Sequence, residues 1–301
     1  DHRHLHLSIR RQRQMCIRDS SLKAKISAIG VFILISIPII TLNGLYQVPD
    51  QISQKIQSKI ENPFKAFKSL FSNTMLNKIV FAAALIAFCM SLNGALYLIW
   101  IDIVMELPEY SSRLILMYYV VSVLGLGMWR YLSIKTSKHF AAGISCLYAI
   151  AILLLGFVGF FIVRDLEQGV KLIAVGSFII LYGFSFSGPL PLINAIIADI
   201  SDKLSLEQGE NISGTVFSYL TTITKVGFAL AAVIPYLVLE LIWGFDINLG
   251  TDNTESSKMA IFYIYTFVPI VCYCIASYML FQHSLGRAEH EKIKSEMQDS
   301  S

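Results

Sequence analysis

The sequence predicts an all-α, polytopic membrane protein. Of its 301 residues, 55% are hydrophobic and 15% are charged, whereas a water-soluble domain of this length would carry about 25% charged residues. The apolar residues gather in seven runs of about 16 to 30 residues, long enough to cross a bilayer as helices. Each run should be helical, because unpaired backbone groups are intolerable in hydrocarbon. The expected spans are residues 26–46, 79–103, 114–129, 140–163, 172–198, 212–241 and 259–281.

The charges between these spans predict how the chain crosses the membrane. Counted on alternate sides after residue 20, the connecting segments hold twelve and six Lys or Arg residues. The positive-inside rule places the richer side, with residues 47–78 and the tail 286–301, in the cytoplasm. We expect a multi-pass protein of the inner, or plasma, membrane. The first span would enter from outside and the sequence does not begin with Met, so we expect a truncated product whose earlier helices are missing.

Two segments outside the spans differ from the rest in composition. Residues 1–20 are rich in His and Arg without periodicity. They resemble translated sequencing-adapter read-through, so we expect them to be non-native; a basic arm for nucleic acid or lipid is the alternative. In residues 47–78, apolar side chains recur at spacings of three and four from Ile56 to Phe71, with lysines between. This pattern predicts an amphipathic cytoplasmic helix on the inner leaflet, with a solvated linker as the alternative.

The sixth run carries Lys225 near its middle, at a depth where a lysine costs about 2.5 to 3.5 kcal/mol. This lysine belongs to a stripe of small and polar side chains at helical spacing. The stripe comprises Gly214, Ser218, Thr221, Lys225, Ala229 and Ala232. Small residues let helices pack closely, but packing alone does not require an ammonium group. Intramembrane ionisable residues usually face a watery cavity and mark a substrate or ion route.

The fifth run contains GFSFSGPLPLINAIIAD, which includes Pro189, Pro191 and Asn194 and ends at Asp199. Proline removes a backbone donor and clashes with the preceding turn. Transporters use such broken helices near the membrane midplane to free backbone groups for a ligand, although a simple kink would explain the prolines equally well. Asn93, in the second run, is a weaker signal of the same kind.

The motifs of covalent catalysis are missing from the sequence. It has no GxxxxGK[ST], no HExxH and no clustered His and carboxylate set, and its five cysteines show no metal spacing. We therefore expect no enzyme, no cofactor and no metal site. The remaining functions are to move, to sense or to hold another molecule.

Two motifs resemble one known family. Asp199, Asp202, Gly209, Lys225 and Gly227 form the pattern D-x2-D-x6-G-x15-K-x-G. It resembles the loop and eleventh helix of the glycoside-pentoside-hexuronide:cation symporters, the melibiose-carrier-like branch of the major facilitator superfamily. The segment WRYLSIKTSKH, residues 129–139, is similar to that family's cytoplasmic loop after the eighth helix. There Ser137 replaces a Gly of the pattern and His139 replaces a Lys or Arg.

The resemblance covers roughly residues 24 to 285 and implies that the seven spans are helices six to twelve of a twelve-helix fold. Residues 21–46 would be the last helix of the N-terminal half, 47–78 the central linker and 79–285 the C-terminal six-helix bundle. The implied activity is symport of a sugar or glycoside with Na⁺ or H⁺ by alternating access. The family's coupling carboxylates lie mainly on early helices, so we expect no transport by this chain alone.

The resemblance also implies roles for single residues. It places Lys225 and Thr221 near the cation and sugar sites. Ser218, Asn93 and Asn194 are further candidates for these sites, because they are polar residues at membrane depth. Asp199, Asp202 and Gly209 would belong to the inner gate. The family often has charged residues where Ser205, Asn211 and Ser213 stand. The charge network of the gate can therefore differ from the family's, and the identity of the substrate stays open.

Other functions remain open from the sequence alone. The partners expected are membrane lipids and a small sugar-like substrate, and no nucleic acid. Within the superfamily, the substrate could instead be a lipid or another amphiphile. A seven-helix retinal protein also buries a lysine, but on its last helix, whereas residues 259–281 contain none. A non-transporting membrane scaffold is a third possibility, for which replacing Lys225 by Leu would be harmless.

Overall fold

A computed structural model of the chain describes residues 27, 30–47, 70–209 and 211–282. These residues belong to two units, a single helix Gly30–Gln47 and a bundle that begins at residue 70. Within the described residues every regular element is a helix. Seven helical segments there are long and apolar enough to cross a membrane, which confirms the predicted all-α, polytopic fold.

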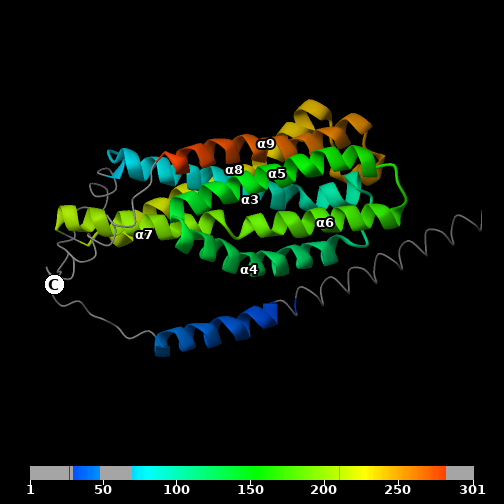
Figure 1. Cartoon of the computed structure of the whole chain (residues 1–301). Helices are drawn as coiled ribbons and strands as arrows, with labels where there is room; N and C mark the ends of the chain where they lie inside the picture. Colours follow the sequence, from blue (N-terminus) through cyan, green and yellow to red (C-terminus); the bar gives the residue numbers. More distant parts are fainter. Residues whose placement is uncertain (1–26, 28–29, 48–69, 210, 283–301) are drawn as a thin grey trace, which may run out of the picture. The chain divides into compact units, whose positions relative to one another are not determined.

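The bundle contains seven α-helices, named as in Figure 1. A π-helical turn, η1 (Trp100–Val104), continues α3, and a 3₁₀ turn, η2 (Ile247–Asp252), precedes α9. The α-helices are α3 (Thr74–Ile99), α4 (Ser111–Lys135), α5 (Lys138–Val163), α6 (Gln168–Phe186), α7 (Pro189–Gln208), α8 (Ser213–Trp243) and α9 (Glu255–Phe281).

Several helices in the bundle extend a few residues beyond the predicted apolar runs, and polar side chains cap the starts of α3, α5 and α9. The Asn73 side chain accepts a hydrogen bond from the Leu76 N–H at 2.9 Å, so α3 starts at Thr74, inside the segment predicted as linker. Ser137 caps α5 in the same way through the Phe140 N–H. The rest of that linker, 48–69, lies outside the described residues, as do the predicted adapter segment 1–20 and the tail 286–301.

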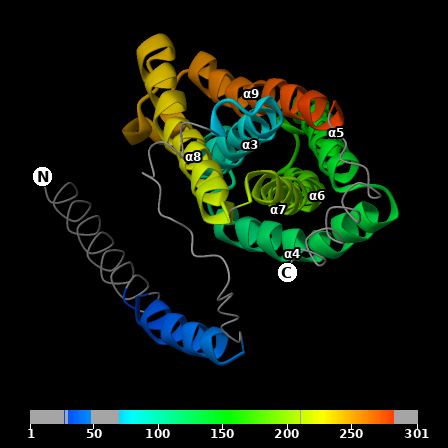
Figure 2. The ribbon, with the colours of Figure 1, turned by 90° about the vertical axis from the view of Figure 1, so that its left-hand side faces the viewer.

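In the view along the bundle, α3 and the α6–α7 pair lie in the middle of the other helices (Figure 2). Helix α3 packs mainly against α8 and α9, while α4 packs mainly against α6, and α5 contacts α6, α7 and α9. Helices α4 and α8 are therefore held by different central helices. Many of their large apolar side chains stay exposed, among them Val123 and Leu124 on α4 and Val226 and Val233 on α8.

The predicted break in the fifth span lies at Ser187 and Gly188, between α6 and α7. Pro189 is the first residue of α7, where its missing N–H is not needed. The Gly188 N–H bonds to the Ser185 carbonyl at 3.2 Å, so the Phe184 carbonyl loses its usual partner. The Trp129 Nε1 of α4 donates to that carbonyl at 2.6 Å. A side chain from another helix thus satisfies the backbone that the break frees.

Candidate functional site

Contacts with α3 fix the rotation of α8 about its own axis. A Cβ at Gly227 would stand 2.6 Å from the Ala84 carbonyl oxygen, so only glycine lets the two backbones approach this closely. Two cross-helix hydrogen bonds lie further along both helices, on one side of this contact. Ser91 Oγ donates to the Phe228 carbonyl at 2.9 Å, and the hydroxyl of Tyr236 donates to the carbonyl of Ala95 at 2.7 Å. The face of α8 that carries Gly227 is therefore turned towards α3.

The predicted stripe of small and polar residues lies on the exposed side of α8. All six of its members, Gly214, Ser218, Thr221, Lys225, Ala229 and Ala232, are exposed. The Lys225 ammonium group is not sealed in apolar contacts, and among the described residues no ion pair or hydrogen bond holds it. Since a lysine at membrane depth normally faces protein or water, this side of α8 is not expected to face acyl chains.

Asn93 lies elsewhere, at a hollow between α3, α4, α6 and α9. Its side chain is 6% exposed, and its Nδ2 donates to the Tyr182 hydroxyl. Its Oδ1 is buried and has no hydrogen-bond partner among the described residues. Besides Asn93, the hollow is lined mainly by aromatic rings, those of Tyr97, Tyr118, Tyr119, Tyr182, Phe186 and Tyr265. A few fixed polar groups among aromatic walls are typical of small-molecule sites.

The predicted gate residues lie on and after α7. The Lys138 Nζ, at the start of α5, contacts the two Asp199 carboxylate oxygens at 2.6 and 2.7 Å and the Ala195 carbonyl at 3.3 Å. Asp202 is half-buried nearby in the sequence. Gly209 ends α7 with φ +66°, a left-handed conformation that favours glycine. Gly209 is therefore a helix cap, while Asp199 and Lys138 join α7 to α5.

The structure brings some of the predicted site residues together and separates others. Ser218, Thr221 and Lys225 share one face of α8. Asn93 lies in the tyrosine hollow and Asn194 is exposed on α7, without a described contact to that face.

Nothing in the sequence marked Trp129, Lys138 and Tyr182 individually as functional candidates. Trp129 and Lys138 belong to the segment WRYLSIKTSKH, so the motif was visible while its contacts with Phe184 and Asp199 were not.

A family model described as MFS/sugar transport protein matches residues 23–287. The chain belongs to this family. The match includes all seven membrane-length helices found among the described residues. No curated protein matches the chain. Membership in the MFS family supports transport across a membrane as the function, in place of catalysis, and agrees with a multi-pass membrane protein.

Proposed function

We propose that this MFS protein is a melibiose-carrier-like symporter, which moves a sugar or glycoside together with Na⁺ or H⁺ across the inner membrane. The observation that carries the proposal is the position of Lys225 on the exposed stripe of α8. A transporter explains why such a costly side chain is kept at membrane depth.

The proposed mechanism is alternating access between two six-helix bundles that rock about a midplane site. The α3–α9 bundle would be one of them, and Gly30–Gln47 would be the last helix of the other. The second bundle would cover the exposed edges of α4 and α8, so that Lys225, Thr221 and Ser218 line water between the two bundles. A cation that crosses with the substrate gains about 2.3 kcal/mol per 100 mV of membrane potential.

The tyrosine hollow is the proposed place for part of the substrate. Its aromatic faces offer flat apolar walls, and the unpaired Asn93 Oδ1 is an acceptor for a hydroxyl group. Asn194 lies on α7, after the helix break, and the substrate would reach it from the inner side of the membrane. The Lys138–Asp199 pair would belong to the inner gate, because it ties α5 to α7 and has to rearrange if these helices separate.

The test is uptake of a panel of radiolabelled sugars and glycosides by cells that express the complete reading frame. The panel includes a lysophospholipid, because an amphiphile is the alternative substrate. Uptake is measured with and without a Na⁺ gradient and with and without a pH gradient. We expect one sugar to accumulate only with one of the gradients, and Lys225→Met to reduce its uptake at least about tenfold.

Lys78→Met, on α3, serves as the matched control and should transport like the parent protein. Three results would contradict the proposal: accumulation of the lysophospholipid alone, sugar uptake that ignores both gradients, or full uptake by a folded Lys225→Met variant.

A further inference from the structure

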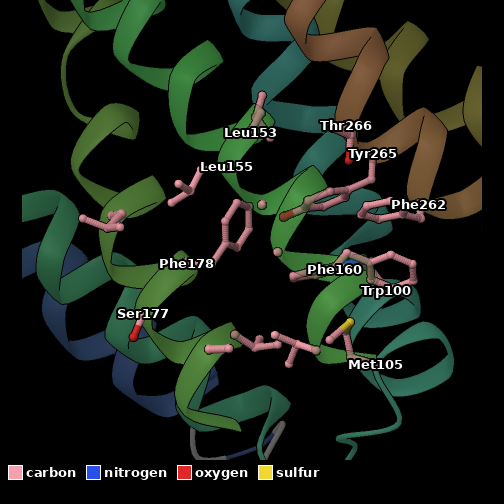
Figure 3. Close-up of a pocket in the computed structure, with 16 residues that line it drawn as sticks. Trp100, Met105, Leu153, Leu155, Phe160, Ser177, Phe178, Phe262, Tyr265 and Thr266 are labelled. Atoms are coloured by element: carbon pink, nitrogen blue, oxygen red, sulfur yellow. The ribbon is translucent and has the colours of Figure 1, made fainter. Parts of the chain in front are cut away.

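A second hollow, separate from the tyrosine hollow, lies between α5, α6, η1 and α9. Its volume is about 220 Å³. Figure 3 shows rings from four elements around it, and the Tyr265 side chain extends from α9 towards Phe178 of α6. At its rim Leu155 is 59% exposed and Leu181 is 37% exposed. Since these residues lie on membrane-length helices, the hollow is a groove in the apolar outer surface of the bundle.

Two glycines of α5 create the room in this groove. A Cβ at Gly156 would stand 2.5 Å from the ring of Phe178, so glycine is needed for that ring to lie where it does. A Cβ at Gly159 would have nothing within 4 Å, so open space lies beside this residue. An apolar hollow without polar partners for water favours an apolar occupant.

The groove also contains a buried N–H donor that has no partner among the described residues. Trp100 is 5% exposed, and its Nε1 makes no hydrogen bond to any residue in the described part of the chain. Its ring stacks on Tyr265 with 4.9 Å between the centroids. A buried N–H without an acceptor is costly, so a carbonyl group of a bound molecule would satisfy it.

A charged hollow adjoins the groove at the end of the bundle where α5 ends and α6 and α9 begin. The two hollows share Phe160, and the Arg164 guanidinium lies over its ring at 5.8 Å. The other charged side chains there are Glu106, Asp165, Lys171, Glu255 and Lys258.

The charged hollow contains three cations and three carboxylates, which do not pair one to one. Lys258 lies 3.7 Å from Glu106 and 4.0 Å from Glu255, and Arg164 lies 3.4 Å from Asp165. Lys171 has no described ion pair. Lys171, and the Nη groups of Arg164, which do not take part in the contact with Asp165, can offer N–H donors to an anion.

We propose that the two hollows together bind one glycerophospholipid. One acyl chain fills the groove beside Gly159, an ester carbonyl accepts from Trp100 Nε1, and the phosphate lies at Arg164 and Lys171. The charge pattern favours this occupant, because cations stand at the membrane edge of an apolar, aromatic groove, and the acidic groups beside them suit an ethanolamine headgroup. The site does not rest on the proposed sugar transport, since it uses none of the same residues except Tyr265, which lies between the two hollows.

The experiment is native mass spectrometry of the full chain, purified in detergent with added phosphatidylethanolamine, phosphatidylglycerol or phosphatidylcholine. We expect one retained phospholipid per chain, with phosphatidylethanolamine held best. Gly159→Leu should weaken retention about tenfold, because the new side chain displaces buried methylene groups of the acyl chain. Lys171→Gln should weaken it about threefold to tenfold, as it removes a partner of the phosphate.

Gly127→Leu is the matched control, since Gly127 of α4 is also a helical glycine with nothing within 4 Å of an added Cβ. It should retain lipid like the parent chain. A second measurement, of tryptophan fluorescence, needs no groove-filling variant. The Trp100→Phe variant identifies the part of the fluorescence that comes from Trp100. Phospholipid with brominated acyl chains should quench that part. Absence of a retained phospholipid, equal retention by both variants and the parent, or an unquenched Trp100 would overturn the proposal.

Discussion

Single polar residues at membrane depth behave in two different ways in this protein. Lys225 lies on an exposed face, where a second bundle or water can solvate it. Asn93 is buried, and its Oδ1 has no partner in the described part of the chain. A buried polar atom without a partner costs about 1 to 3 kcal/mol. Such a cost is retained where function requires the group, which argues for Asn93 as a substrate contact.

This interpretation predicts opposite effects of Asn93→Leu on stability and on transport. The variant removes the unpaired oxygen together with one hydrogen bond to Tyr182, so Tm should stay unchanged or rise. Uptake by the complete protein should fall at least about tenfold, because the substrate loses an acceptor. Ser91→Ala, which removes a satisfied hydrogen bond to Phe228, should cost about 0.5 to 1.5 kcal/mol and serves as the comparison. A stability loss above about 2 kcal/mol with normal uptake would assign Asn93 a purely structural role.

Gly227 provides a second prediction for a single residue. Gly227→Ala places a methyl group 2.6 Å from the Ala84 carbonyl oxygen, so α8 has to move away from α3. We expect a loss of about 1 to 3 kcal/mol in the free energy of unfolding, measured by thermal or denaturant unfolding in detergent. Gly214→Ala, on the same helix with nothing within 4 Å, should be neutral or slightly stabilising. Equal effects of the two substitutions would show that helix propensity, and not close packing, governs both positions.

At the scale of elements, the α6–α7 break depends on a neighbour. Proline and glycine end α6 and begin α7, and Trp129 of α4 bonds to the Phe184 carbonyl that the break leaves free. Four residues after Phe184, Gly188 packs against α5, where a Cβ would stand 2.6 Å from the Ser145 Cβ. The break is thus held in place from two sides, as a hinge point between α6 and α7 would require.

We expect Trp129→Phe to destabilise the bundle by about 1 to 3 kcal/mol, because the Phe184 carbonyl loses its strongest donor. Pro189→Ala restores a backbone N–H and lets the helix continue. In the Pro189→Ala background, Trp129→Phe should therefore cause a smaller loss of stability. Thermal unfolding of the four proteins in a double-mutant cycle measures the difference. Equal losses in both backgrounds would mean that Trp129 acts through its ring contacts, such as that with Tyr148, and not through the break.

At the scale of the whole molecule, the two kinds of exposed surface should differ in what covers them. The α8 stripe combines small and polar residues with Lys225, whereas the α5 surface around Leu155 is apolar throughout its exposed part. Alternating access requires water at the first surface in one of the conformations, while the second should face lipid.

Cysteine labelling in membranes tests this difference. In a cysteine-free background, Thr221→Cys should react with a water-soluble maleimide and Leu155→Cys should not, since thiols in hydrocarbon stay protonated and out of reach of the reagent. Transported sugar should protect the first position. A reactive Leu155→Cys together with an inert Thr221→Cys would mean that the surfaces have been assigned the wrong way round.

The sequence by itself determined the all-α membrane fold, the seven spans and the place of the helix break. Apolar length, helical spacing and proline act locally, so they can be read without knowing which helices are neighbours. The fold also followed from two short motifs, whose family the match over residues 23–287 confirms at the level of the superfamily.

Only the tertiary structure decided which face of α8 carries Lys225, since the Gly227 contact and two cross-helix hydrogen bonds set its rotation. It alone joined Lys138 to Asp199 and Trp129 to Phe184, placed Asn93 among tyrosines from four helices, and set a charged hollow beside an aromatic groove. These are contacts between residues far apart in the chain. Their geometry depends on how closely the helices pack, which no local pattern specifies.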